Sequence, residues 1–176
     1  MELKIRELYA DEIECRVGTI KEEGLTLLLY KDARADQNIL DEAVGCMNWL
    51  RRHTRDNANC VVSIWDEAKK QWIEKEDTGT ESYTEKEKGL ASDSFKRACV
   101  NWGIGRELYT APFIWISKDD CKITRSSAGK LQCFDNFQVR KIVYKDKKII
   151  GLAIQNARTK KYVFVLKPTE TGGKNE

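Results

Sequence analysis

The chain has 176 residues, 41% of them hydrophobic and 34% charged, which predicts one soluble globular domain large enough to have a core of its own. The net charge is +3, but residues 137–167 hold nine Lys or Arg against Asp146 alone, which indicates an acidic partner such as nucleic acid. No apolar run approaches the roughly 20 residues that a membrane span needs, and no signal peptide is visible. The six cysteines form no C-x-x-C pair, so we expect a reduced, cytoplasmic protein.

The N-terminal part predicts a short lead-in followed by a β-hairpin. Residues 2–10 have weak helical spacing, while residues 14–20 and 25–30 have the composition and patterning of strands. Gly24 ends the turn between them, where we expect it to supply a positive φ. Leu27–Leu29 is continuously apolar, so the second strand is expected to be covered on both faces.

A helix and three strands are expected next. Asp32 can cap a helix that runs through Val44 and ends at Gly45, with Ile39, Leu40, Ala43 and Val44 on its buried face. Residues 49–55, 59–65 and 71–78 then read as strands. Arg51, His53 and Arg55 alternate onto one face of the first, and Trp65 and Trp72 are placed to pair across the last turn.

A second helix is expected around residues 89–102. Ala91, Phe95, Ala98 and Trp102 recur on one stripe with Cys99 at its edge, Gly103 ends the helix, and two capping-box spacings, Ser82–Glu85 and Thr84–Glu87, precede it. Lys96 and Arg97 point away from the stripe. They are either the solvated edge of a core helix or cations offered to a polyanion.

The composition and the hydrophobic pattern of the sequence change after Pro112. Residues 113–116 predict a short strand, 118–130 are polar and irregular, and 139–144, 149–155 and 162–166 predict a three-stranded meander. We therefore expect an α+β protein with a hairpin–helix–antiparallel sheet–helix core over residues 1–112. A basic β-rich extension would follow over 113–168, and then a disordered tail over 169–176.

The motifs give little support for catalysis. Gly103-Ile-Gly105 has no third glycine of a dinucleotide fingerprint, and Gly18–Gly24 lacks the G-K-[ST] ending of a phosphate loop. His53 is the only histidine, and Glu67 and Lys69, which have nuclease-like spacing, fall in an expected turn. The sequence thus predicts a protein that is not an enzyme and that uses no cofactor or metal, with a metal-dependent nuclease as a minor alternative.

Single-strand binding fits the residue types better, because it needs cations for phosphates and flat side chains for bases. The cations are Arg16, Arg51, Arg52, Arg55, Lys96 and Arg97. The aromatic candidates are Tyr30, Trp49, Trp65 and Trp72, and for each tryptophan core packing is the alternative.

Three separated motifs resemble the Rad fifty-two (Rad twenty-two) family of single-strand annealing proteins and its phage members. Asp93-S-F-K-R-A-C-V-N-W-G-I-Gly105 is similar to the family's D-G-L-K-R-A-x-R-x-F-G-x-x-L signature. Tyr30-K-D-A-Arg34 with the segment to Met47-N-Trp49, and Asp11-E-I-E-C-R-V-Gly18, match in the same order. The resemblance covers about residues 8–110. Val100 stands where many members have another Arg, and Cys15 replaces a common aromatic residue.

The resemblance implies ATP-independent binding and annealing of single-stranded DNA in homologous recombination and DNA repair, by homo-oligomeric rings or filaments that can load a recombinase. In a phage-encoded member this would occur in the bacterial host cytoplasm. By position, Arg16, Lys96 and Arg97 match the groove cations, and we add Arg51, Arg52, Arg55 and Tyr30 as DNA-binding candidates. A recombinase or a single-strand-binding protein is the expected protein partner. The alternative is an adaptor of the same fold that recruits a recombinase or a nuclease.

Overall fold

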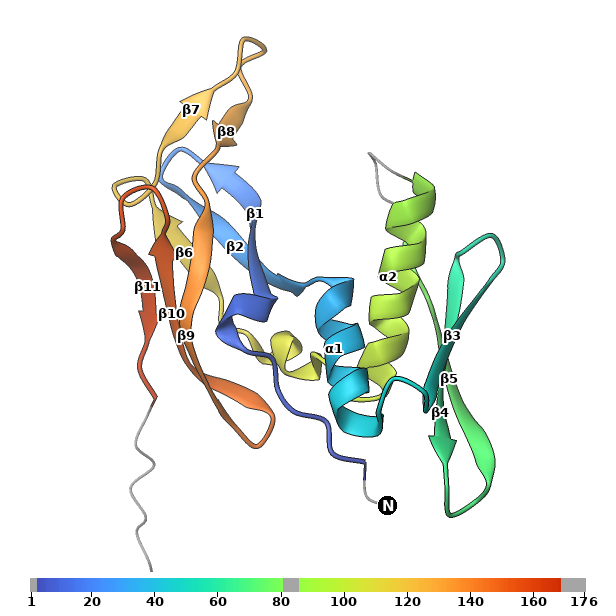
Figure 1. The fold of residues 1–176 in the computed structure, drawn as a ribbon. Coiled ribbons are helices and arrows are strands. Elements are labelled where there is room, and N and C mark those ends of the chain that lie inside the picture. Colours follow the sequence, from blue (N-terminus) through green and yellow to red (C-terminus); the bar gives the residue numbers. More distant parts are fainter. Residues whose placement is uncertain (1–2, 81–85, 169–176) are drawn as a thin grey trace, which may run out of the picture. The chain divides into compact units, whose positions relative to one another are not determined.

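The chain has a mixed α+β structure with mostly antiparallel sheets. The computed structural model describes residues 3–80 and 86–168 (Figure 1). It divides into two compact units, of which unit 1 comprises Met1–Leu8 and Lys31–Arg106, and unit 2 comprises Tyr9–Tyr30 and Glu107–Glu176. Each unit is therefore built from two separate stretches of the chain.

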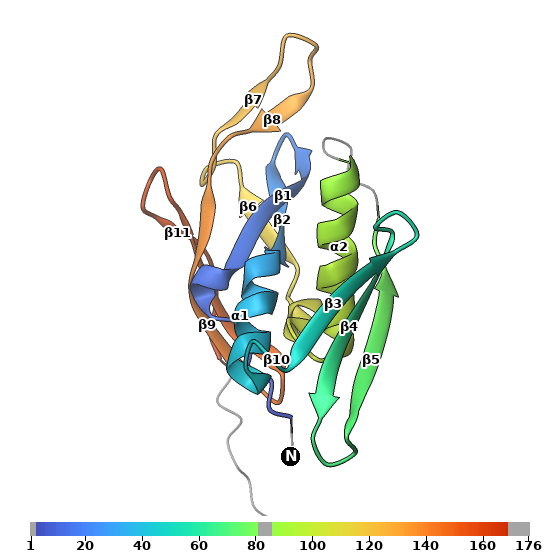
Figure 2. The ribbon, with the colours of Figure 1, turned by 45° about the vertical axis from the view of Figure 1, so that its right-hand side comes forward.

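Unit 1 is a three-stranded sheet with two helices. Its elements are α1 (Ala33–Val44), β3 (Trp49–Thr54), β4 (Asn59–Asp66), β5 (Gln71–Thr78) and α2 (Lys86–Asn101). The strand order is β3-β4-β5, α2 packs against β4 and β5, and α1 contacts α2 and β3 (Figure 2). The predicted order of helix, three strands and helix is confirmed.

The ends of α1 are set by the predicted residues. The Asp32 carboxylate accepts hydrogen bonds from the backbone N–H groups of Arg34, at 2.8 Å, and Ala35, at 3.0 Å, and Gly45 ends the helix with φ +83°. The buried face differs in part from the prediction. Its fully buried residues are Ala35, Asp36, Ile39 and Leu40, whereas Ala43 and Val44 are only half-buried.

The core of unit 1 lies between α2 and the sheet. Phe95, Ala98 and Cys99 are completely buried, as their common stripe predicts, and Trp102 is half-buried with its indole N–H donating to the Val62 carbonyl at 3.0 Å. On the sheet, Trp65 pairs with Trp72, and their rings meet edge to face with centroids 5.5 Å apart. This cross-strand pair is also confirmed.

Unit 2 is a six-stranded sheet with a projecting hairpin. Its elements are η1 (Ala10–Glu12), β1 (Ile13–Lys21), β2 (Gly24–Lys31), η2 (Arg106–Thr110), β6 (Ile114–Ser117), β7 (Ile123–Arg125), β8 (Leu131–Cys133), β9 (Phe137–Lys145), β10 (Lys148–Asn156) and β11 (Tyr162–Leu166). The strand order is β11-β10-β9-β1-β2-β6, and the edge strands β6 and β11 also contact each other, so the sheet curls. β7 and β8 pair as an arm that extends beyond this sheet (Figures 1 and 2).

The interior of unit 2 is filled by alternate residues of these strands. Those fully buried include Leu25, Ile116, Leu152 and Ile154. Gly24 is required by a close approach of β6, because a Cβ there would lie 2.3 Å from the Ile116 carbonyl oxygen. This close approach, more than the turn, accounts for the glycine, whose φ of +157° is nearly extended.

The division of the chain differs from the one expected at residue 112. Residue Glu14 of β1 is paired with Gln138 of β9, so the meander and the first hairpin belong to one sheet. The meander itself is present as predicted, with β9, β10 and β11 adjacent and antiparallel. Local patterning shows each strand but not its distant partner, which explains why the extension was expected to be separate.

Two smaller expectations are wrong. Leu28 is 48% exposed, so β2 is not covered on both faces. Residues 118–130 are not wholly irregular, because they contribute to the β7–β8 arm, whereas residues 3–9 form the expected lead-in, without a helix. The capping-box side chains of Ser82–Glu87 and the tail at 169–176 lie outside the described part of the chain.

Candidate nucleic-acid interface

The first candidate surface lies on the β1–β2 hairpin of unit 2. Residues 14, 16, 28 and 30 are the exposed positions of an alternating pattern on these strands, and we call them the hairpin surface (Glu14, Arg16, Leu28 and Tyr30). A Cβ on Gly18, between them, would lie 3.5 Å from Leu28 Cδ1. The hairpin surface therefore joins polar and apolar side chains on one sheet face.

Arg16 and Tyr30 are in direct contact on this surface. The guanidinium carbon of Arg16 lies 4.5 Å from the centroid of the Tyr30 ring, within the range of a cation–π interaction. The Arg16 side chain is 51% exposed and Tyr30 is 38% exposed. The two residues were selected for different reasons, one as a phosphate contact and one as a stacking ring, and the structure brings them together.

Glu14 holds the Arg16 guanidinium, and sequence reasoning did not include it. Its Oε2 accepts from Arg16 Nη2 at 2.8 Å and from Nε at 3.2 Å. These bonds use part of a five-donor fork, so donors remain for an anion. The sequence alone could have indicated this contact, because Glu14 and Arg16 are residues i and i+2 of one strand and therefore share a face.

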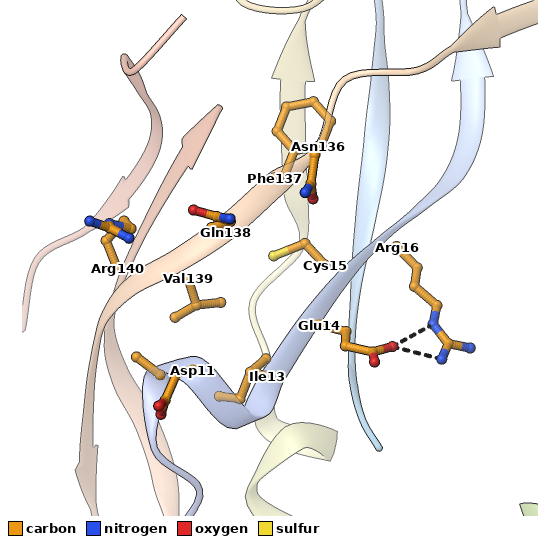
Figure 3. A pocket seen from close by; sticks show the side chains of 11 residues that line it. Asp11, Ile13, Glu14, Cys15, Arg16, Asn136, Phe137, Gln138, Val139 and Arg140 are labelled. Atoms are coloured by element: carbon orange, nitrogen blue, oxygen red, sulfur yellow. Dashed lines mark hydrogen bonds and ion pairs between the residues drawn. The ribbon is translucent and has the colours of Figure 1, made fainter. Parts of the chain in front are cut away.

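A pocket of about 450 Å³ opens between β1 and β9, next to the hairpin surface (Figure 3). Arg16 and Arg140 lie at opposite sides of it, and the Cys15 sulfur points toward β9 (Figure 3). Burial raises the pKa of the Cys15 thiol to about 12, so this sulfur stays protonated and is not a nucleophile at neutral pH. The amides of Asn136 and Gln138 add hydrogen-bond donors and acceptors to the lining.

The cations of β3 in unit 1 point in different directions. Arg51 shares the face of Trp49, toward α2, and its guanidinium carbon lies 5.1 Å from the centroid of the Phe95 ring. Arg52 lies on the opposite face, where Nη2 is 3.9 Å from Glu74 Oε2. Arg55 starts the β3–β4 turn with φ +52°, so it does not continue the predicted alternation.

Lys96 and Arg97 of α2 also diverge. Arg97 is exposed and its Nε lies 3.3 Å from Oδ1 of Asp77 on β5. Lys96 is half-buried and close enough to Asp36 of α1 to lower the pKa of that carboxyl, although burial raises it overall. The structure therefore does not gather the predicted cations of unit 1 into one cluster.

The tryptophans of unit 1 serve mainly in packing. Trp49 stacks on Phe95 with centroids 6.2 Å apart, and its indole N–H donates to Asp41 Oδ1 at 2.7 Å. Trp72 remains 38% exposed beside Trp65. Trp49 therefore has the packing role that was the alternative to base stacking.

The surroundings of His53 do not resemble an acid–base site. Its Nδ1 lies 3.4 Å from the Ser94 hydroxyl, and burial, with the nearby Arg51 charge, lowers its pKa. Among residues 3–80 and 86–168, no three or more His, Cys, Asp or Glu side chains are arranged to hold a metal ion. Within the same ranges, no helix is long and apolar enough to cross a membrane.

Comparisons of the chain with protein-family models, with curated proteins and with solved structures find no significant match.

Proposed function

We propose that this protein binds single-stranded DNA and anneals complementary strands without a nucleotide cofactor. The observation that carries the proposal is the contact between Arg16 and Tyr30 on the exposed hairpin surface. A partly exposed guanidinium beside a partly exposed aromatic ring supplies both interactions that single-strand binding requires, a cation for the phosphate and a flat surface for the base.

The contact also suits a protein that must hold a strand loosely. Glu14 already accepts two hydrogen bonds from Arg16, so a phosphate gains only the remaining donors. Tyr30 keeps one stacking partner in the free protein, which limits what a base gains by replacing it. Weak contacts of this kind leave bases available to a complementary strand, and neutralised phosphates lower the repulsion between the two strands.

The same sheet supplies further positive charge. Nine Lys or Arg against Asp146 lie in residues 137–167, which form β9, β10, β11 and their turns. Arg158 pairs with Asp135 at 2.5 Å, whereas Arg140, Lys141 and Lys148 are exposed residues of β9 and β10. A basic sheet adds affinity for nucleic acid without reading its sequence.

The proposal includes the properties implied by the resemblance to the Rad fifty-two family. The protein would assemble into homo-oligomeric rings or filaments and act in recombination or repair, with a recombinase or single-strand-binding protein as partner. The rival hypotheses are an adaptor of the same fold, which would bind DNA weakly and regardless of length, and a metal nuclease, which would degrade strands when magnesium is added.

The test compares variants of the hairpin surface in binding and annealing. Arg16→Gln and Tyr30→Leu should each weaken binding of fluorescent oligonucleotides, and Arg16→Gln should lower the slope of log affinity against log salt by roughly 0.7. Tyr30→Phe, which keeps a ring, should bind like the parent. Lys69→Gln is the matched charge control, since Lys69 lies in the β4–β5 turn of unit 1 and pairs only loosely with Asp66 at 3.5 Å.

Annealing is then measured with complementary oligonucleotides in EDTA and without ATP. The proposal requires annealing by the parent protein and a slower rate for Arg16→Gln. Parent-like binding by a folded Arg16→Gln, Tyr30→Leu double variant would exclude the hairpin surface as the interface. Binding without annealing would favour the adaptor.

A further inference from the structure

Two cysteine thiols meet at the base of the β7–β8 arm in unit 2. Cys133 of β8 is paired with Ile123 of β7, and Cys121 precedes Ile123 by two residues. Cys121 lies in the bend that leads into β7, so Cys121 and Cys133 lie at the same end of the arm. Their side chains are within hydrogen-bonding reach of each other, and both thiols are free.

Hydrogen bonds connect the chain segments on either side of the arm, next to these thiols. The Asn156 amide donates to the Asp120 carbonyl at 3.1 Å and to Asp135 Oδ2 at 2.9 Å, and the Lys122 N–H donates to Asp135 Oδ2 at 2.8 Å. Asn156 is completely buried. These bonds hold the chain before β7 and the chain after β8 together, which keeps the two sulfurs adjacent.

The charged groups that face the thiols are Arg158, Asp135 and Asp120. The Arg158 guanidinium interacts electrostatically with both sulfurs while its Nε is held 2.5 Å from Asp135 Oδ1. The Asp135 and Asp120 carboxylates oppose thiolate formation at Cys121. Arg158 is thus the one cation among these three groups.

We propose that Cys121 and Cys133 form a reversible redox site that small-molecule disulfides of the glutathione type convert into an intramolecular disulfide. The inference does not depend on nucleic-acid binding. Formation of the bond would close the loop of residues 121–133 at the base of the arm.

The two sulfurs have different parts in the reaction. Cys121 is only 7% exposed, its thiol donates to the Ser117 carbonyl at 3.3 Å, and burial raises its pKa to about 11, so it is a poor first nucleophile. Cys133 is only half-buried, so it is more exposed than Cys121. Its thiolate attacks the reagent, forms a mixed disulfide and releases one glutathione thiolate.

In the second step the Cys121 thiol loses its proton to solvent, and its sulfur displaces the second glutathione thiolate. Two protein thiols are oxidised to one disulfide, and one glutathione disulfide is reduced to two thiols, so atoms and electrons balance.

The test is peptide mapping of the full chain after treatment with oxidised glutathione at pH 8 and alkylation of the remaining thiols. Trypsin cuts after Lys118, Lys122, Lys130 and Arg140. The expected product is peptide 119–122 joined to peptide 131–140, lost again on reduction with dithiothreitol. The melting temperature should rise by several degrees when the bond forms.

Serine variants separate the two roles. Cys121→Ser should accumulate a glutathione adduct on Cys133, whereas Cys133→Ser should leave Cys121 unmodified. Arg158→Gln should slow disulfide formation at pH 7, and Arg158→Lys should restore most of the rate. Cys46 is exposed and provides the internal control, because it takes up glutathione without an intramolecular partner. The proposal would be overturned if Cys46 takes up glutathione while Cys121 and Cys133 stay reduced and are alkylated. Separate glutathione adducts on Cys121 and Cys133 would overturn it as well.

Discussion

Lys31 and Asp36 form an ion pair in the interior of unit 1. Lys31 is 5% exposed, Asp36 is completely buried, and the Lys31 ammonium donates to Oδ1 of Asp36. The same ammonium lies 3.4 Å from the Lys96 carbonyl, and the other Asp36 oxygen, Oδ2, accepts no hydrogen bond from the part of the chain that the structure describes. Gly105 makes room for the pair, since a Cβ there would lie 2.3 Å from Lys31 Cε.

Removing one partner should be costly, because the other charge would remain buried without compensation. We expect Asp36→Asn or Lys31→Met to lower the free energy of unfolding by about 3–5 kcal/mol. The double variant Lys31→Met, Asp36→Asn should lose much less than the sum of the two. Urea unfolding of the four proteins measures this coupling. Additive losses would show that the two charges do not interact.

The Asp36 carboxylate should also make the stability of the protein depend on pH, in a direction that its pKa defines. Burial raises the pKa of Asp36 to about 6, from 3.8, although Lys31 opposes the shift. Between these values the folded state binds more protons than the unfolded state, so stability from this group is complete below pH 3.8 and is lost as the pH rises through 6. The difference in unfolding free energy between the parent and Asp36→Asn should therefore change between pH 4 and 6. An equal difference across this range would contradict the shifted pKa.

The sequence predicted unit 1 well because its signals are local. The Asp32 cap, Gly45, the stripe through Phe95 and Ala98, and the Trp65–Trp72 pair all depend on residues a few positions apart or across one turn. Neither the Lys31–Asp36 pair nor its burial was predicted. A polar residue in the first turn of a helix usually faces solvent, and only the tertiary fold covers Asp36.

The strands of the six-stranded sheet of unit 2 were each predicted, but the sheet as a whole was not. The contact of β1 with β9 joins residues far apart in the sequence, and no turn signal specifies it. In the candidate interface, Arg16 and Tyr30 were selected individually and their contact could not be foreseen. The side chains of Lys96 and Arg97 point in different directions for a local reason. Adjacent residues on a helix differ by about 100° in direction, so their partners decide what each one does.

Truncation after Ser117 tests the unity of the six-stranded sheet. It would remove β9, β10 and β11, including the buried Phe137, Leu152 and Ile154, and leave β1 with β2 as its one remaining neighbour in the sheet. We expect loss of strand signal in circular dichroism and no cooperative unfolding of unit 2. A truncated protein that keeps the hairpin folded would show that the meander is dispensable.

The charge of the meander can be tested without removing it. Arg140, Lys141 and Lys148 are exposed on β9 and β10, so their triple substitution by Gln should leave the melting temperature close to that of the parent. It should lower the salt-dependence slope of single-strand binding by up to roughly 2, about 0.7 for each phosphate contact. An unchanged slope in the folded variant would assign the binding elsewhere.

Asp135 should make unit 2 sensitive to acid. The hydrogen bond from Arg158 is the main cause that lowers the pKa of Asp135 to about 2, from 3.8, against the effect of burial. The unfolded state binds more protons between these values, so this contribution is present above pH 3.8 and is lost as the pH falls toward 2. Asp135→Asn should be less stable than the parent at pH 6, with a smaller difference at pH 2. A constant difference would exclude the ion pair as its source.

Variants of Lys96 and Arg97 can show whether these cations of α2 contact DNA or only stabilise the fold. Arg97 is tied to Asp77, so Arg97→Ala frees a carboxylate on β5, whereas Lys96 compensates the buried Asp36 charge. If both cations also contact phosphates, each alanine variant should bind single strands more weakly, whatever their sequence, and lower the salt slope by roughly 0.7. Alanine itself suits the helix, so any loss of stability reports the lost charge contacts. Arg97→Ala with Asp77→Asn is the matched control, because it removes the pair without leaving an excess negative charge. If this double variant binds like the parent while Arg97→Ala alone binds weakly, repulsion by Asp77 explains the effect, and Arg97 is not a DNA contact.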